Sequence, residues 1–230
     1  MSLSPDAQHK SIPDLLAAGA AQLQLALTAP QLMQLEQYIN ELAHWNKTFN
    51  LTAITQPTEM VVYHVFDALA VCAYWLQRQR QQIQNSDVAA WVDLGSGAGI
   101  PGMVLAIVAP EQQWLLVDGN GKKARFLRHV ARSLAISSVQ VYHARIEQLP
   151  ASERPQGKLI YMARALGPAV DIVNWVAPWL QANDEVILMK SQNLNQEAQL
   201  TAASFTTPEI IELKVPFLDA YRCIMTTRYR

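Results

Sequence analysis

The sequence is poor in cysteine, and this limits the chemistry that it can support. Cys72 and Cys223 are the two cysteines among 230 residues, they lie far apart, and neither belongs to a Cys-x-x-Cys pair. Such a set can build neither a disulfide framework nor a zinc ribbon. We therefore expect a protein of a reducing compartment, the cytoplasm, without a structural metal.

A dominant charge and a long hydrophobic run are also missing. The chain has 18 basic and 19 acidic side chains and a formal net charge of -1, so a nucleic acid must be met by a local patch. No apolar run approaches the roughly 20 residues of a membrane span, and the apolar stretch from Leu15 to Ala21 lacks the basic region and the long hydrophobic region of a signal peptide. With 50% hydrophobic residues, the composition predicts a packed globular protein without a membrane partner. We expect a monomer.

The first part of the chain has a helical pattern. Apolar residues recur at helical spacing from Leu32 to Phe49, after a helix start at Thr28, and a second apolar stripe follows Pro57. A polar stretch of low complexity then covers residues 77–87. We place a boundary there, between a helical N-terminal extension (residues 1–87) and a second domain (residues 88–230).

Beyond that boundary, short strands alternate with helical segments, which is the pattern of parallel βαβ units. The predicted strands end at or near Asp93, Asp118, His143, Arg164 and Lys190. A further helical segment follows, and residues 210–215 and 221–227 then suit an antiparallel pair. The expected fold is therefore a Rossmann-like α/β sheet, mostly parallel with an antiparallel C-terminal strand. Its strands end along one edge, where such sheets bind ligands.

Glycine is scarce but clustered at one place. The chain has nine glycines where average usage would give about sixteen, yet four of them fall within residues 93–102. Glycines let the backbone turn sharply between a strand and a helix and approach a ligand closely, and Pro101 suits the first turn of that helix. This glycine loop predicts a nucleotide-like ligand.

Two carboxylates favour one such ligand over another. The residues Gly97-x-Gly99-x-x-Gly102 match a dinucleotide fingerprint, but Asp93 just before the loop would repel a pyrophosphate. S-adenosylmethionine instead offers an ammonium and a sulfonium group. Asp118 ends the next strand, where an acidic residue can hold both ribose hydroxyls. We favour the methyl donor; a nicotinamide cofactor, or a tight turn without any ligand, remains an alternative.

Several segments resemble, in order, the bacterial 16S ribosomal RNA guanine-N7 methyltransferase family, also called glucose-inhibited division protein B. They are Asn-Leu-Thr-Ala-Ile at 50–54, His-Val-Phe-Asp at 64–67, the glycine loop at 92–102, Gly-Lys-Lys-Ala-Arg-Phe-Leu at 121–127 and Ala-Arg-Ile-Glu at 144–147. The resemblance covers roughly residues 40–225. It implies a class I methyltransferase that uses S-adenosylmethionine to methylate N7 of a guanine in a loop of the small-subunit RNA.

The resemblance also implies roles for single residues. Gly95 and Ile100 would line the methionine end of the cofactor, Ile146 and Glu147 would lie beside its adenine, and Arg164 would stand at the edge between cofactor and substrate. The chain departs from the family's usual residues at positions 119–122, 162–165 and 189–191.

Basic residues are concentrated between positions 121 and 135, where no acidic residue occurs. At helical spacing they form what we call the basic stripe: Lys122, Arg125, Arg128 and Arg132. The stripe is either an ordinary solvated helix face or a surface that meets RNA phosphates. The lack of balancing acidic residues favours RNA, with Lys190 as a further contact.

We assign no catalytic residue. Guanine N7 carries a free lone pair, so its methylation removes no proton and needs no general base. Catalysis then consists of positioning, with Arg164 as a candidate for orienting the substrate. His143 is expected to be structural, whereas His64 and Asp67 could have either a structural or a functional role. The competing functions are a nicotinamide-dependent oxidoreductase and a ribosome-assembly module that binds RNA without catalysis.

Overall fold

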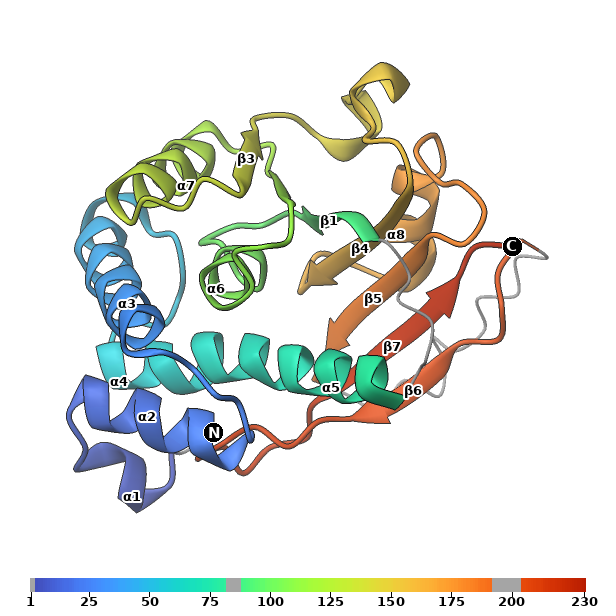
Figure 1. Ribbon diagram of the computed structural model, residues 1–230. Coiled ribbons are helices and arrows are strands. Elements are labelled where there is room, and N and C mark those ends of the chain that lie inside the picture. The colour runs from blue at the N-terminus through green and yellow to red at the C-terminus, as the bar shows by residue number, and fades with distance from the viewer. Residues whose placement is uncertain (1–2, 82–87, 192–203) are drawn as a thin grey trace.

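The computed structural model describes residues 3–81, 88–191 and 204–230, which form one sheet and the helices around it (Figure 1). The sheet has seven strands in the order β3-β2-β1-β4-β5-β7-β6. The strands are β1 (Val88–Leu94), β2 (Trp114–Val117), β3 (Val139–Tyr142), β4 (Lys158–Arg164), β5 (Glu185–Lys190), β6 (Glu209–Glu212) and β7 (Cys223–Arg228).

Strands β1 to β5 pair in parallel, while β7 is antiparallel to both β5 and β6. This confirms the predicted fold class and the antiparallel pair near the C-terminus. The register brings the strand ends level, because Leu94 lies beside Val117 on one side and beside Ala163 on the other. The segments that follow β1, β2 and β4 therefore leave the sheet at the same edge.

The helices are α1 (Pro5–Gln8), α2 (Ile12–Gln22), α3 (Ala29–Phe49), α4 (Pro57–Met60), α5 (Asp67–Gln81), α6 (Gly102–Val108), α7 (Gly121–Ser133) and α8 (Ala169–Val176). A π-helical segment, η1 (Val61–Phe66), joins α4 to α5, and the 3-10 turns η2 (Ile146–Gln148) and η3 (Ala151–Glu153) follow β3. Helix α3 begins where predicted because Thr28 and Gln31 form a capping box. It ends at Asn50, which has a left-handed conformation with φ 50.

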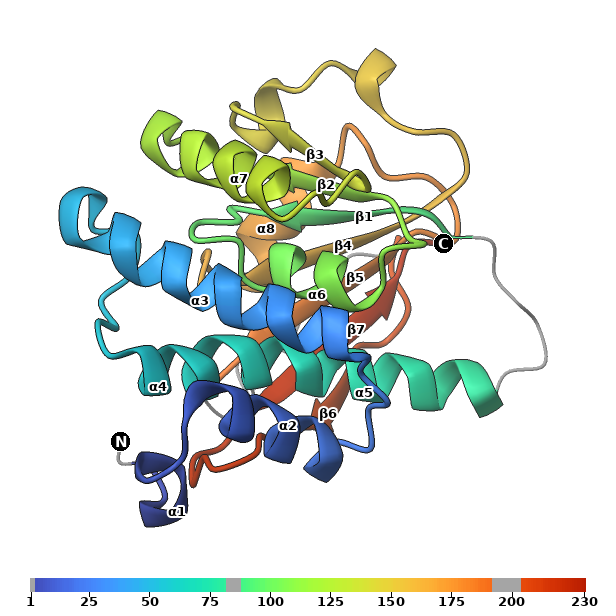
Figure 2. The same ribbon diagram turned by 60° about the vertical axis from the view of Figure 1, so that its left-hand side comes forward.

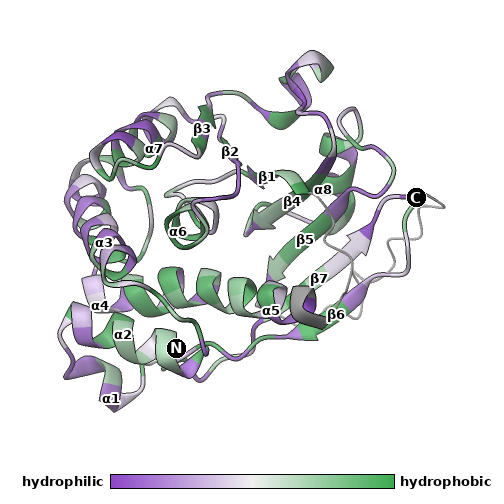
Figure 3. Ribbon diagram, in the orientation of Figure 1, coloured by the Kyte–Doolittle hydropathy of each residue, from purple (hydrophilic) through white to green (hydrophobic). Residues whose placement is uncertain are grey.

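The sheet has a core on each face. In β1, neighbouring side chains point to opposite faces, so Trp91 joins the core beneath α3, α5, α6 and α7, whereas Val92 joins the core beneath α8. Figure 2 shows α3 crossing the molecule between α7 and the line of α4 and α5. Helix α5 and the central strands are mainly hydrophobic, while α3 and α7 also carry hydrophilic residues (Figure 3). The N-terminal helices thus share a core with the sheet.

Some predicted boundaries differ from the structure. Strand β3 stops at Tyr142, one residue before the predicted end at His143, and β6 stops at Glu212 rather than at Val215. Helix α2 begins at Ile12, after the N-cap Ser11, whose side chain accepts a hydrogen bond from the amide of Asp14. The polar stretch from residue 82 to 87 and most of the helical segment predicted after Lys190 lie outside the described residues.

One continuous helical stretch, Pro57–Arg78, is long and apolar enough to cross a membrane by length and composition alone. In the fold, 61% of its most apolar window is buried, and Val65, Phe66 and Leu69 belong to the core between the sheet and α2. Its hydrophobicity is therefore explained by packing inside the protein.

Candidate active site

The glycine loop makes a tight turn between β1 and α6. Gly95, Gly97 and Gly99 have positive φ values of 64, 59 and 92, a region that side chains strongly disfavour. The amides of Gly99 and Ile100 both donate to the carbonyl of Ser96, at 2.7 and 3.1 Å. The loop is thus held by its own backbone, and glycine is required because the chain folds back on itself.

Asp93 lies under this loop and is only 1% exposed. Its Oδ2 accepts a hydrogen bond of 3.0 Å from the amide of Gly102 at the start of α6, while its Oδ1 is buried without a partner among the described residues. Burial raises the pKa of Asp93 from an ordinary 3.8 to about 7. A buried acceptor without a partner is costly, so Oδ1 needs a partner that the described residues do not supply.

Asp118 connects the glycine loop with the turn before α7. Its Oδ2 accepts from the amide of Gly97 at 2.8 Å, and its Oδ1 accepts from the amide of Asn120 at 2.7 Å. The Asn120 side chain in turn caps α7. Each carboxylate oxygen keeps a second lone pair, so Asp118 can still accept from ribose hydroxyls. The structure therefore brings the two predicted carboxylates to the same loop.

The remaining predicted cofactor residues lie on the same edge of the sheet. Ile100 is buried at the end of the glycine loop, and Ile146 is buried in η2 just after β3. Glu147 is exposed on η2, 3.9 Å from the guanidinium of Arg145. A Cβ atom at Gly97 would meet no atom closer than 3.7 Å, so the space above this glycine is open to a ligand.

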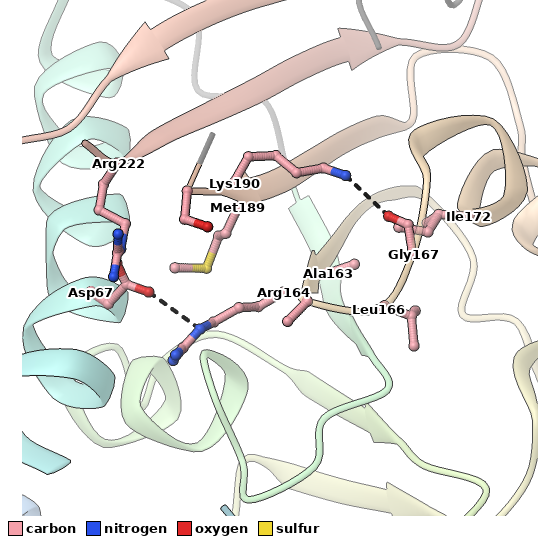
Figure 4. A pocket seen from close by; sticks show the side chains of 11 residues that line it. Asp67, Ala163, Arg164, Leu166, Gly167, Ile172, Met189, Lys190 and Arg222 are labelled. Carbon is pink, nitrogen blue, oxygen red and sulfur yellow. Dashed lines mark hydrogen bonds and ion pairs between the residues drawn. The ribbon is translucent and has the colours of Figure 1, made fainter. Parts of the chain in front are cut away.

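A cluster of buried charges lies at the end of β4. The carboxylate of Asp67, at the start of α5, accepts Nε of Arg164 at 3.2 Å and Nε of Arg222 at 3.1 Å (Figure 4). Arg222 comes just before β7, 155 residues from Asp67 along the chain. The sequence analysis did not single out Arg222, because no local pattern connects it with the other two.

His64 belongs to the same cluster. The guanidinium nitrogens of Arg164 lie 3.3 and 3.4 Å from its Nδ1, and its Nε2 lies 2.9 Å from Oγ1 of Thr52. Burial, and then the charge of Arg164, lower the pKa of His64 to about 4, so the ring is neutral near pH 7. Arg164 thus joins His64 and Asp67, the two residues whose roles the sequence left open.

A cavity of about 200 Å³ opens beside this cluster, and we call it the β4–β5 cavity. Its lining includes Arg164, Lys190 and Arg222, and the Lys190 ammonium donates to the carbonyl of Gly167 at 3.0 Å. Leu166 also lines the cavity, and it packs so closely on Gly95 that a Cβ atom there would overlap it. The cavity therefore adjoins the glycine loop.

The basic stripe lies on α7, and all four of its side chains are exposed. Three of them, Arg125, Arg128 and Arg132, line a groove of about 790 Å³ between α7 and the edge strand β3, together with His143. The opposite face of α7 packs on the core through Phe126, Leu127 and Val130. The neighbouring His129 faces α3 instead, where it pairs with Glu41 at 2.8 Å.

A largely parallel sheet with β7 inserted antiparallel, a glycine loop after β1 and carboxylates at the ends of β1 and β2 define a class I, S-adenosylmethionine-dependent methyltransferase. A methyltransferase from Geobacter sulfurreducens shares the fold, with a TM-score of 0.55 at 14% identity over 93% of this chain and 96% of that one. A structure of MtNAS in complex with S-adenosylmethionine has a TM-score of 0.56 at 13% identity, covering 94% of this chain and 77% of that one.

Sequence comparison identifies the family. A family model described as rRNA small subunit methyltransferase G matches residues 31–225. The ribosomal RNA small subunit methyltransferase G of Dichelobacter nodosus is 36% identical over 94% of each chain, and that of Methylibium petroleiphilum is likewise 36% identical over 94% of each. The chain belongs to the ribosomal RNA small subunit methyltransferase G family. This confirms the family resemblance and the enzyme class predicted from the sequence.

Proposed function

We propose that this enzyme transfers the methyl group of S-adenosylmethionine to N7 of a guanine in a loop of 16S ribosomal RNA. One arrangement carries the proposal. Asp93 and Asp118 accept hydrogen bonds from amides of the glycine loop and of the helix start that follows it, and a cavity lined by basic side chains adjoins this loop. The bound cofactor supplies an activated methyl group on a sulfonium. The protein then has to hold two ligands, and the site offers separate surfaces for them.

The residues present fit this cofactor. Asp93 supplies a buried acceptor for the ammonium of the methionine moiety, and Asp118 supplies acceptors for the ribose. Gly95, Gly97 and Ile100 would line the methionine end, whereas Ile146 and Glu147 follow β3 and would face the adenine. Arg164, between the glycine loop and the β4–β5 cavity, would orient the substrate beside the methyl group.

The cluster near the cavity supports a mechanism without a general base. Asp67 is engaged by two guanidinium groups, and His64 is neutral but contacts Arg164 and Thr52. Guanine N7 attacks with its own lone pair, so the protein need not remove a proton. The residues would accelerate transfer by aligning the two reactants and by fixing charges around them.

The RNA would meet the basic stripe on α7, with Lys190 as a contact nearer the methyl group. All four stripe residues are exposed and three of them line one groove, which supports this interpretation. We further propose that residues 1–87 are an extension packed on the methyltransferase domain, that the protein is monomeric, and that it acts in the cytoplasm on 16S RNA or the small ribosomal subunit. Cys72 and Cys223 are not joined in a disulfide, which suits that compartment.

Transfer of a labelled methyl group tests the proposal directly. Purified protein is incubated with labelled S-adenosylmethionine and with naked 16S RNA or small subunits that lack the modification, and the modified base is mapped. We expect label at N7 of one guanine. Binding of RNA without transfer would favour a non-catalytic assembly factor. Stabilisation of the fold by NAD, but not by S-adenosylhomocysteine, would favour an oxidoreductase.

A further inference from the structure

The groove between α7 and β3, which we call the α7–β3 groove, has an apolar floor. Val139 and Val141 lie two residues apart on β3, so both side chains point to the face of the sheet that α7 covers. Together with Ala131 of α7, they pack on the hydrophobic core but remain partly exposed. Covering this apolar surface is favourable, so the floor suits a ligand that has an apolar face.

The helical wall of the groove is basic. Arg125, Arg128 and Arg132 lie at helical spacing along it, and its lining residues in the described part of the chain include no acidic side chain. All three arginines are exposed. A guanidinium group pairs with phosphate through its edge and stacks on an aromatic ring through its face. The wall therefore suits a ligand that combines negative charge with a flat ring.

The strand side of the groove argues against a peptide that adds a strand to the sheet. Within the described residues, β3 is the outermost strand on its side of the sheet. The amide of Trp114 donates to the carbonyl of Ser138, and a parallel ladder engages every second residue of an edge strand. The carbonyls of Val139 and Val141 therefore face away from β2. Arg128 already donates to that of Val141 at 3.1 Å, so an added strand would have to displace it.

Size and position narrow down the ligand further. The volume of about 790 Å³ lies within the roughly 300–1,000 Å³ of pockets that enclose small ligands, whereas a phosphate contact alone would leave the apolar floor uncovered. Gly121 and His143 bring the lining to the edge of the sheet at which the glycine loop lies. Strand β3 is two strands from β1, so at about 4.8 Å per strand the groove is roughly 10 Å from that loop.

We propose that the α7–β3 groove binds the base of an unpaired nucleotide of the RNA, near the target guanine in the chain. The base lies on Val139 and Val141, while the arginines stack on it and pair with the flanking phosphates. Unpaired nucleotides suit such a site because both faces of the base are accessible. The proposal rests on the proposed function, in which RNA is the substrate. It adds a base site to a surface that otherwise meets phosphates.

The test fills the groove without removing charge. Ala131→Met places a longer apolar side chain at the floor, in a helix that tolerates methionine. The matched control, Ala43→Met, makes the same change at a partly buried position of α3 that does not line the groove. In filter-binding assays, Ala131→Met should bind 16S RNA about five- to hundredfold more weakly than the parent, as for the loss of one stacked base.

The salt dependence separates the base from the phosphates. Because Ala131→Met keeps all three arginines, the slope of log affinity against log salt should equal that of the parent. Affinity for S-adenosylhomocysteine should also be unchanged, since the cofactor does not occupy the groove. Ala43→Met should match the parent in all three measurements.

RNA without bases shows directly whether a base is bound. An oligoadenylate of about ten nucleotides and an abasic chain of the same length carry equal charge. The parent and Ala43→Met should prefer the oligoadenylate about five- to hundredfold, and Ala131→Met should lose most of this preference. A preference that survives in Ala131→Met would place the base contact elsewhere and overturn the proposal.

Other results would also overturn it. One is a folded Ala131→Met protein that binds 16S RNA as tightly as the parent. Another is a variant that binds naked RNA normally but small subunits poorly, which would assign the groove to a protein segment. If Ala131→Met does not fold, Ser137→Met, at an exposed position of the lining, carries the same expectations. These assays measure binding, so a parent that binds RNA without methylating it would refute the proposed function and leave this test intact.

Discussion

At Asp93 the fold buries a carboxylate beneath the glycine loop, and under the proposed function this group would meet the cationic part of the cofactor. Without a ligand, burial disfavours the charged form and raises the pKa to about 7. Protonation of Asp93 in the folded state then adds to the free energy of unfolding. This contribution is complete below pH 4 and is lost as the pH rises through 7. A cationic ligand has the opposite preference, because it requires the carboxylate.

This opposition predicts a pH dependence of cofactor binding. Below pH 7 the α-ammonium of S-adenosylhomocysteine is charged, and its binding must remove the proton from Asp93. Affinity should therefore increase with pH, by up to about tenfold per unit between pH 5.5 and 7, and then level off. Isothermal calorimetry in buffers of different ionisation enthalpy measures both the affinity and the proton release.

Asp93→Asn supplies the control for this prediction. The amide cannot ionise, so the variant should bind more weakly at pH 7.5 and should show a nearly flat profile between pH 5.5 and 7. A parent profile that is already flat, with no proton released, would mean that Asp93 does not face the cationic group of the ligand.

Helix α3 shows how an element outside the βαβ pattern takes part in the site. The buried Tyr38 hydroxyl donates to the carbonyl of Ala98 in the glycine loop at 2.8 Å. Other side chains of α3 hold the ends of neighbouring helices, since Gln31 donates to the carbonyl of Val108 and Gln34 to that of Leu134. The helix therefore holds the glycine loop and the two helices that follow β1 and β2.

Tyr38→Phe tests this role, and Tyr161→Phe is its matched control. Each change removes one buried hydroxyl that donates to a carbonyl, and Tyr161 donates to Trp179 on the other face of the sheet. Both variants should lose about 1 to 3 kcal/mol of stability, because a buried carbonyl is left without its partner. Only Tyr38→Phe should also weaken S-adenosylhomocysteine binding, by about five- to tenfold.

Thermal unfolding and calorimetric titration separate the two effects. Equal cofactor affinities in the two variants, at similar losses of stability, would reduce Tyr38 to a packing residue. The hydroxyl itself does not titrate near neutral pH, because burial raises the pKa of Tyr38 far above its ordinary range. The difference between the variants should therefore be the same at pH 6 and at pH 8.

The limits of sequence analysis follow from how far apart the interacting residues are. The glycine loop, Asp93 and Asp118 could be predicted because strand ends and turns leave local patterns. The contact between Tyr38 and Ala98 spans 60 residues and that between Asp67 and Arg222 spans 155, so no local pattern indicates them. Helix α1 went unnoticed for another reason: it has only four residues, too few for a periodic pattern.

Across the whole molecule, charge is balanced in amount but not in position. The formal net charge is -1, yet α7 presents four exposed basic side chains and has no acidic residue. Among these four residues, Arg128 and Arg132 are better suited to a test of RNA binding. Lys122 lies close to the Asp118 turn, where a change could also affect the cofactor. Arg128 donates to the carbonyl of Val141 at 3.1 Å, a contact at the exposed surface whose loss should cost little stability.

Reversal of both charges, Arg128→Glu with Arg132→Glu, should weaken binding of ribosomal RNA by at least tenfold at moderate salt. Each lost phosphate contact should flatten the salt slope by about 0.7 to 0.9, and cofactor affinity should barely change. The control pair, Lys214→Glu with Arg228→Glu, reverses two exposed charges away from α7 and shifts the net charge equally. If both pairs weaken RNA binding alike, only overall charge matters. If neither does, the stripe is a solvated face, and the RNA contact would have to be sought in the N-terminal helices or near Arg164 and Lys190.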